Sequence, residues 1–134
     1  YKDTVRRFKK IFSLQDYDIL FIPGSGTVGI ESVIFSLNGK IKTIGNQGTF
    51  FTRWENMIDT YSKRGTDHNL YCQLETSNSS YYEGSGIVDC ISAFPYYTIP
   101  PNTDIFYLVN LTKPPQLPLL IYFIILTLFL ENLI

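Results

Sequence analysis

The sequence feature that most constrains the fold is a glycine-rich turn, Pro23-Gly24-Ser25-Gly26-Thr27. It follows an apolar run, residues 18–22, that is typical of a buried strand. The apolar residues after the turn are spaced as on one face of a helix: Ile30, Val33, Ile34 and Leu37. Glycine allows close approach to the backbone, and the first N–H groups of a helix have no partner within it. A strand, a glycine turn and a helix start therefore predict a site for an anion, with a phosphate as its natural ligand.

Two common kinds of phosphate site fit the surrounding residues poorly. The glycines at 24, 26 and 29 match the spacing of the dinucleotide fingerprint, which also needs an acidic residue about 20 positions further on. The run Gly45-Asn46-Gln47-Gly48, which follows the next predicted strand, contains no acid. An ATP phosphate loop ends in Gly-Lys-Ser/Thr, and this turn has no lysine. Support for a third kind of phosphate site comes from motifs later in the chain.

The composition is that of a globular domain. The chain has 134 residues, of which 45% are hydrophobic and 16% aromatic, enough to form the core of one domain. Its net charge of −1 gives no electrostatic reason to expect nucleic acid as a partner. Cys72 and Cys90 are interpreted as reduced packing thiols of a cytoplasmic protein, and no spacing indicates a metal site. Because the chain begins with Tyr1 rather than methionine, we expect a piece of a longer protein or a missing start.

Predicted strands alternate with predicted helices along the chain. Helices are expected at residues 1–12, after the turn, and at 52–61; strands are expected at 18–22, 40–44, 70–74, 87–89 and 104–109; residues 62–69 are expected to form a loop. This alternation indicates an α/β fold with a mostly parallel sheet and helices on both of its faces.

The C-terminal end has a different character. Residues 119–130 are apolar except for Thr127, but a stretch this short is below the roughly 20 residues that span a bilayer. We expect a buried strand or an out-of-frame tail here, with a membrane anchor as the less favoured alternative. The chain is therefore divided into residues 1–118 and an apolar tail, 119–134.

Four further motifs carry polar residues beside predicted strands or helices. They are Asn46-Gln47-Gly48-Thr49-Phe50-Phe51-Thr52-Arg53, Glu75-Thr76-Ser77-Asn78, Val88-Asp89-Cys90-Ile91-Ser92-Ala93-Phe94-Pro95 and Asn110-Leu111-Thr112-Lys113. Carboxyl ends of parallel strands meet at one edge of a sheet, where ligands bind. We therefore expect Ser25, Thr27, Asp89 and Lys113 to converge there.

The five motifs, in this order, resemble those of the class V aminotransferases, pyridoxal-phosphate enzymes with the aspartate-aminotransferase type of fold. They are most similar to the branch of alanine–glyoxylate, serine–pyruvate and 2-aminoethylphosphonate–pyruvate aminotransferases. The resemblance covers residues 1 to about 120 and corresponds to the middle of a full enzyme. It implies that 1–118 is a partial cofactor-binding large domain. The implied reaction moves an amino group from a small amino donor to a 2-oxo acid such as pyruvate or glyoxylate. A homodimer is implied where the full fold is present.

The resemblance also implies how the cofactor is held. Ser25, Gly26 and Thr27 would bind its phosphate. Phe50 would stack on the pyridine ring, and Thr76 would form a hydrogen bond near the phenolic oxygen.

Two residues would carry the chemistry. Asp89 would pair with the pyridine nitrogen and keep it protonated, so that the ring can accept electrons from the substrate. Lys113 would anchor the cofactor covalently and then move a proton as the base.

Departures from the family pattern leave a second interpretation open. The stretches before residues 75 and 88 are short, and Pro114 and Pro115 follow Lys113, which favours an extended backbone at that lysine. The alternative is a non-catalytic, truncated remnant of such an enzyme, held at a membrane through residues 119–130.

Overall fold

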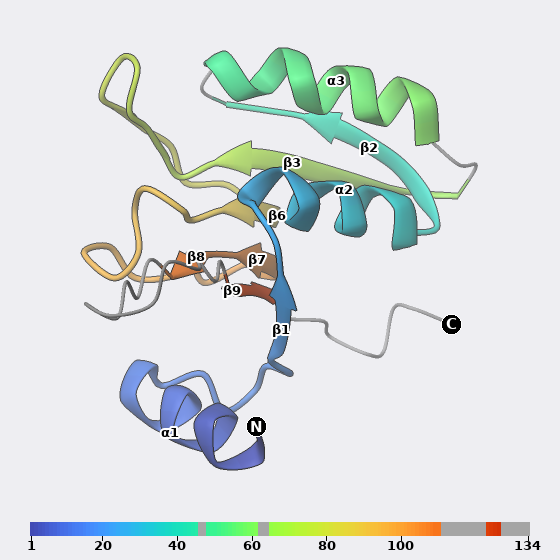
Figure 1. Cartoon of the computed structure of the whole chain (residues 1–134). Coiled ribbons are helices and arrows are strands. Elements are labelled where there is room, and N and C mark those ends of the chain that lie inside the picture. The colour runs from blue at the N-terminus through green and yellow to red at the C-terminus, as the bar shows by residue number, and fades with distance from the viewer. Residues whose placement is uncertain (46–47, 62–64, 111–122, 127–134) are drawn as a thin grey trace.

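The computed structural model describes residues 1–45, 48–61, 65–110 and 123–126. Within these ranges the helices are α1 (Lys2–Phe12), α2 (Gly26–Ser36) and α3 (Thr49–Tyr61). The strands are β1 (Leu20–Pro23), β2 (Gly39–Thr43), β3 (Thr66–Cys72), β4 (Leu74–Glu75), β5 (Ser80–Tyr81), β6 (Gly86–Asp89), β7 (Thr103–Tyr107), β8 (Val109–Asn110) and β9 (Phe123–Leu126). Figure 1 shows α3 and α1 at opposite ends of the molecule, with the strands between them.

The main sheet is parallel and has the strand order β2-β3-β6-β7. This confirms the predicted α/β class with its mostly parallel sheet. The register places Asp89, the last residue of β6, beside Cys72 of β3 on one side and Tyr107 of β7 on the other. Three side chains at neighbouring strand ends are therefore brought together by the sheet itself.

A second, antiparallel sheet has the order β1-β9-β8 and was not predicted. Its middle strand, β9, comes from the apolar tail and pairs with β1 from Leu20 to Pro23. Residues 123–126 of the tail thus form a strand. β4 and β5 form a separate two-stranded hairpin around residues 76–79. Among the described residues no helix is long and apolar enough to cross a membrane.

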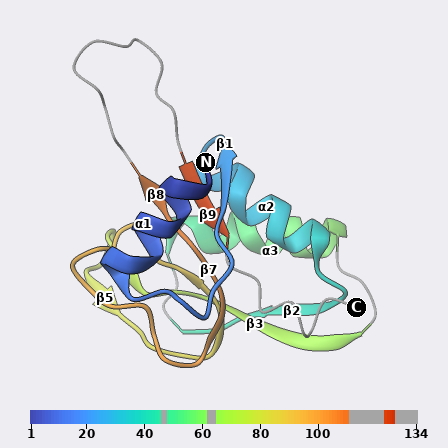
Figure 2. The ribbon, with the colours of Figure 1, turned by 90° about the horizontal axis from the view of Figure 1, so that it is seen from below.

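Alternation along the parallel strands creates two cores. Leu70, Ile87 and Ile105 face α2 and α3, whereas Val88 and Phe106 face the opposite side, where α1 packs. Figure 2 shows α2 and α3 side by side and α1 apart from both. The prediction of helices on both faces is confirmed.

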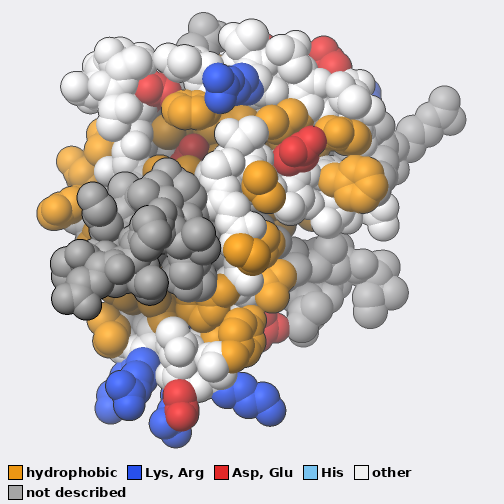
Figure 3. All heavy atoms as spheres, viewed as in Figure 1, with side chains coloured by type: hydrophobic (Ala, Val, Ile, Leu, Met, Phe, Trp, Pro, Cys, Tyr) orange, Lys and Arg blue, Asp and Glu red, His pale blue; other side chains and the backbone are white. Residues whose placement is uncertain are grey.

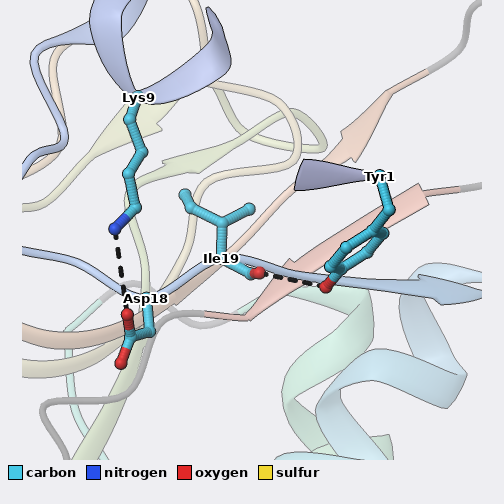
Figure 4. Close-up of polar contacts among 4 residues, drawn as sticks. All are labelled: Tyr1, Lys9, Asp18 and Ile19. Carbon is cyan, nitrogen blue, oxygen red and sulfur yellow. Dashed lines mark hydrogen bonds and ion pairs between the residues drawn. The ribbon is translucent and has the colours of Figure 1, made fainter. Parts of the chain in front are cut away.

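Helix α1 is held mainly by aromatic packing and by two polar contacts, one from its N-cap residue and one from its last turn. Phe12 lies against Phe94 with ring centroids 4.6 Å apart. The Tyr1 hydroxyl donates to the Ile19 carbonyl at 3.3 Å, and Lys9 Nζ lies 3.8 Å from Asp18 Oδ1 (Figure 4). Basic side chains gather over this helix on the surface seen in Figure 3. The helix predicted at residues 1–12 therefore packs through its aromatic side chains and keeps its charged side chains in water.

Three predicted boundaries are wrong. β3 begins at Thr66, inside the predicted loop 62–69, because its polar residues pair with β2 from Gly39 onward. The predicted strand 104–109 is split into β7 and β8, which belong to different sheets. Helix α3 begins three residues before the predicted 52–61, immediately after the glycine turn.

Candidate functional site

A cavity of about 390 Å³ lies where the strands β3, β6 and β7 end and the helices α2 and α3 begin. This volume is within the range of small-molecule sites, about 300–1,000 Å³. The structure brings six predicted site residues to its wall: Ser25, Gly26, Thr27, Phe50, Thr76 and Asp89. The seventh, Lys113, lies outside the described residues, as does the Asn46-Gln47 part of the second motif.

The anion end of the cavity is the start of α2. Ser25 is the N-cap, and its hydroxyl accepts a hydrogen bond from the Val28 N–H at 3.4 Å. Gly26 and Thr27 are the first two residues of the helix, so their N–H groups have no intrahelical acceptor. The first turn contains no acidic side chain. A phosphate would therefore meet free donors, one or two hydroxyls and the positive end of the helix dipole.

A second feature of the cavity is the buried carboxylate of Asp89. Only 8% of this residue is exposed, and Oδ1 accepts a hydrogen bond from the Ile91 N–H at 2.9 Å. Burial, with a smaller contribution from the nearby Glu75, raises the pKa of Asp89 from 3.8 to about 6. Burial destabilises the charged form of this carboxylate, so a positively charged ligand group beside it would be a strong partner.

The raised pKa makes stability depend on pH in a defined direction. The folded chain holds the Asp89 proton more tightly than the unfolded chain, so the free energy of unfolding should fall as pH rises from about 4 to about 6. Above that window the loss is complete and amounts to roughly 3 kcal/mol. Asp89→Asn removes the charge and keeps the shape, so we expect the variant to be more stable than the parent at pH 7.

Urea unfolding of both proteins at a series of pH values measures this difference. The two free energies should converge below about pH 4, where the carboxyl is protonated in both states. An identical gap between parent and variant at every pH would contradict the assignment of the titration to Asp89.

Phe50 and Arg53 form the outer rim of the cavity. Phe50 is 48% exposed and lines the cavity, so part of its ring is accessible to a ligand. The Arg53 guanidinium lies 5.8 Å from the centre of this ring, which supports a cation–π contact. The rim therefore combines an aromatic surface with a positive charge, which suits an anionic, planar ligand.

Glu75 is a second buried acid in the wall. Its Oε1 accepts the Ser77 N–H at 2.9 Å, and only 5% of the residue is exposed. Gly48 leaves the space that the Glu75 carboxylate occupies, because an added Cβ would overlap that group. The second and third motifs are thus packed against each other, and Thr76 is exposed at their junction.

Sequence reasoning missed several lining residues, among them Trp54, Cys72 and Tyr107. Cys72 and Tyr107 flank Asp89 in the register, but both lie inside the strands predicted at 70–74 and 104–109, so no sequence signal marked them as strand ends. Trp54 follows Phe50 by one helical turn, which was the available signal in α3. In the part of the chain that the structure describes, no group of three or more His, Cys, Asp and Glu could hold a metal ion.

The fold is similar to part of the fold of phosphoserine aminotransferases, one of which is bound to pyridoxal phosphate (PLP). It matches a phosphoserine aminotransferase from Cytophaga hutchinsonii with a TM-score of 0.71 at 18% identity, over 96% of this chain and 44% of that chain. The PLP-bound enzyme from Trichomonas vaginalis gives 0.71 at 15% identity, over 98% and 46%. A phosphoserine aminotransferase studied for radiation damage of its Schiff base gives 0.69 at 12% identity, over 98% and 46%.

These comparisons show the fold and its extent. The chain spans less than half the length of the three enzymes. No protein-family model matches the chain. No curated protein matches it in sequence. The branch suggested by the motifs, alanine–glyoxylate and its relatives, differs from the phosphoserine enzymes found by structure, so the branch stays a prediction.

Proposed function

We propose that the chain binds pyridoxal phosphate in this cavity as part of an aminotransferase of the class V type. Such an enzyme would move an amino group from a small amino donor to a 2-oxo acid such as pyruvate or glyoxylate. One observation carries the proposal. A buried carboxylate, Asp89, and the N-terminus of α2 both line one cavity of about 390 Å³. One structure of the same fold holds this cofactor.

The residues present fit the chemistry of the cofactor. Its phosphate would accept hydrogen bonds from the free N–H groups of Gly26 and Thr27 and from the hydroxyls of Ser25 and Thr27. The exposed part of Phe50 would pack on the ring, and Thr76 would reach the edge of the ring from the hairpin. When bound, the cofactor supplies an electron sink for the carbanion formed at the substrate Cα.

Asp89 would hold a proton in place at the far end of the ring. Its pKa of about 6 leaves the carboxylate mostly ionised at neutral pH. Because water is largely excluded at 8% exposure, the attraction between this carboxylate and a ring N–H⁺ is stronger than it would be in solvent. Pairing of this kind would lower the pKa of Asp89 again.

Lys113 is proposed as the covalent anchor and as the base that moves the substrate proton. Its position in the chain supports this role. Lys113 comes three residues after β8 (Val109–Asn110), and β8 itself follows β7, which ends at the cavity residue Tyr107. Borohydride reduction of the PLP-loaded chain, followed by peptide mass mapping, tests it. We expect the pyridoxyl group on Lys113 and its loss in Lys113→Ala. An adduct on Lys40, Lys42 or Lys63 instead, or none on loaded protein, would end the assignment.

The remaining expectations stay predictions. They are the division at residue 118, the homodimer, the cytoplasmic location and attachment to a membrane through 119–130. The non-catalytic alternative is supported by one observation, the Pro114-Pro115 pair after Lys113. It predicts that PLP binds in the cavity without a covalent adduct, so the same reduction experiment separates the two proposals.

A further inference from the structure

We propose that Tyr107 is a positioning residue whose hydroxyl donates a hydrogen bond to the Asp89 carboxylate and orients it toward the cavity. The proposal deepens the proposed function, because it concerns the residue that would face the cofactor ring. Its physical content, a donor–acceptor pair across β6 and β7, can be tested without any cofactor.

The first observation is an unpaired polar atom in the wall of the cavity. Tyr107 is 1% exposed, and its hydroxyl has no hydrogen-bond partner of normal geometry among the described residues. A buried hydroxyl without a partner destabilises a fold, and phenylalanine would fill the same space without that cost. The hydroxyl is therefore not explained by packing of the core.

The second observation is the register of the sheet. Tyr107 and Asp89 are direct neighbours on adjacent parallel strands, and both line the cavity. Strands in a sheet lie about 4.8 Å apart, so side chains at paired positions on one face are within reach of each other. The Ile91 N–H already holds Asp89 Oδ1. A rotation of the phenolic O–H would add a second donor to the same carboxylate.

The surroundings of Tyr107 and Asp89 make Tyr107 the hydrogen-bond donor and Asp89 the acceptor. Burial and the neighbouring Asp89 charge raise the pKa of Tyr107 well above 10, so its hydroxyl keeps its proton. The hydroxyl in turn lowers the pKa of Asp89, which burial and Glu75 raise. The other charged or titratable groups in the wall are Cys72 on β3, whose pKa burial raises to about 12, and Arg53 on α3. Tyr107 is thus a neutral hydroxyl donor at a position paired with Asp89.

Tyr71 provides a matched control. It is also fully buried, at 0% exposure, but it lies on β3 and faces the core on the α1 side of the sheet. Its hydroxyl donates to the Gly84 carbonyl at 3.2 Å. Tyr107→Phe and Tyr71→Phe therefore remove the same atom from two buried sites, of which only one faces the cavity.

The experiment follows the Asp89 side-chain carboxyl by carbon NMR through a pH titration of the whole chain without cofactor. In Tyr107→Phe the midpoint should rise by about one pH unit, because one hydrogen bond to the charged form is lost. In Tyr71→Phe it should stay where it is, while the urea midpoint falls. The urea midpoint of Tyr107→Phe should be unchanged or higher.

A substitution of opposite sign completes the test. Fluorotyrosine at position 107 is a stronger donor and should lower the Asp89 midpoint, which a merely structural ring would not do. An unmoved midpoint in both position-107 variants would overturn the proposal, as would an equal rise in Tyr71→Phe. Failure of PLP to bind would contradict the proposed function and leave these titrations intact, so the two outcomes are distinguishable.

Discussion

Replacing Asp89 with alanine is expected to lower turnover per bound PLP about a hundredfold or more, with a smaller loss of PLP affinity. In the proposed reaction the carboxylate would stabilise charge that develops as the substrate Cα–H breaks, so its contribution would be larger in the transition state than in the ground state. Thr27→Ala should behave in the opposite way. The proposed phosphate contact would be the same in the ground and transition states, so its loss should weaken binding roughly tenfold and leave turnover per bound PLP unchanged.

Both quantities are measured on the same preparations. PLP affinity follows from quenching of the fluorescence of Trp54, the sole tryptophan, which is 2% exposed and lines the cavity. Turnover is then expressed per bound PLP. Equal losses of affinity in the two variants, with unchanged turnover, would refute this division of roles. Ser36→Ala, at the far end of α2, serves as the control for substitution in that helix.

Alanine substitutions of two adjacent phenylalanines should have different effects, one on the free energy of unfolding and the other on PLP affinity. Phe51 is 6% exposed and packs on Trp54 with ring centroids 5.4 Å apart, so Phe51→Ala should lower the free energy of unfolding by about 3–5 kcal/mol. Phe50 is 48% exposed on the rim. Phe50→Ala should change stability by less than about 1 kcal/mol, yet weaken PLP binding about tenfold through lost stacking.

Chemical denaturation and PLP titration of the two variants give the comparison. The two variants control for each other, because each substitution removes one phenyl ring from the first turn of α3. If Phe50→Ala is the more destabilising change, the orientation of α3 described above is wrong. If Phe50→Ala binds PLP as the parent does, the ring does not take part in the site.

Much of the fold could be predicted because local patterns determine it. The glycine turn, the helix after it and the buried strand at 87–89 depend on nearby residues, and the structure contains all three. The polar start of β3 could not be recognised, since its residues extend a strand only because β2 lies beside them. The pairing of β1 with β9 depends on residues at opposite ends of the chain, and no periodicity encodes it.

The same distinction applies to the site. Motifs at strand ends converge by the geometry of parallel sheets, so Ser25, Thr27 and Asp89 could be expected at one edge. Tyr107 could not, because its importance lies in an unpaired hydroxyl that only the packed structure reveals. The role of Lys113 depends on residues outside the described ranges and remains a prediction.

The position of β9 has a consequence for the order in which the chain can fold. Among the described residues β1 pairs only with β9, which lies almost the whole length of the chain away. During synthesis the N-terminal part emerges first, but β1 then has no strand to pair with, and closing so long a loop is slow. β1 leads directly into the turn before α2. The strand that leads into the anion end of the cavity therefore cannot be paired before residues 123–126 have been made.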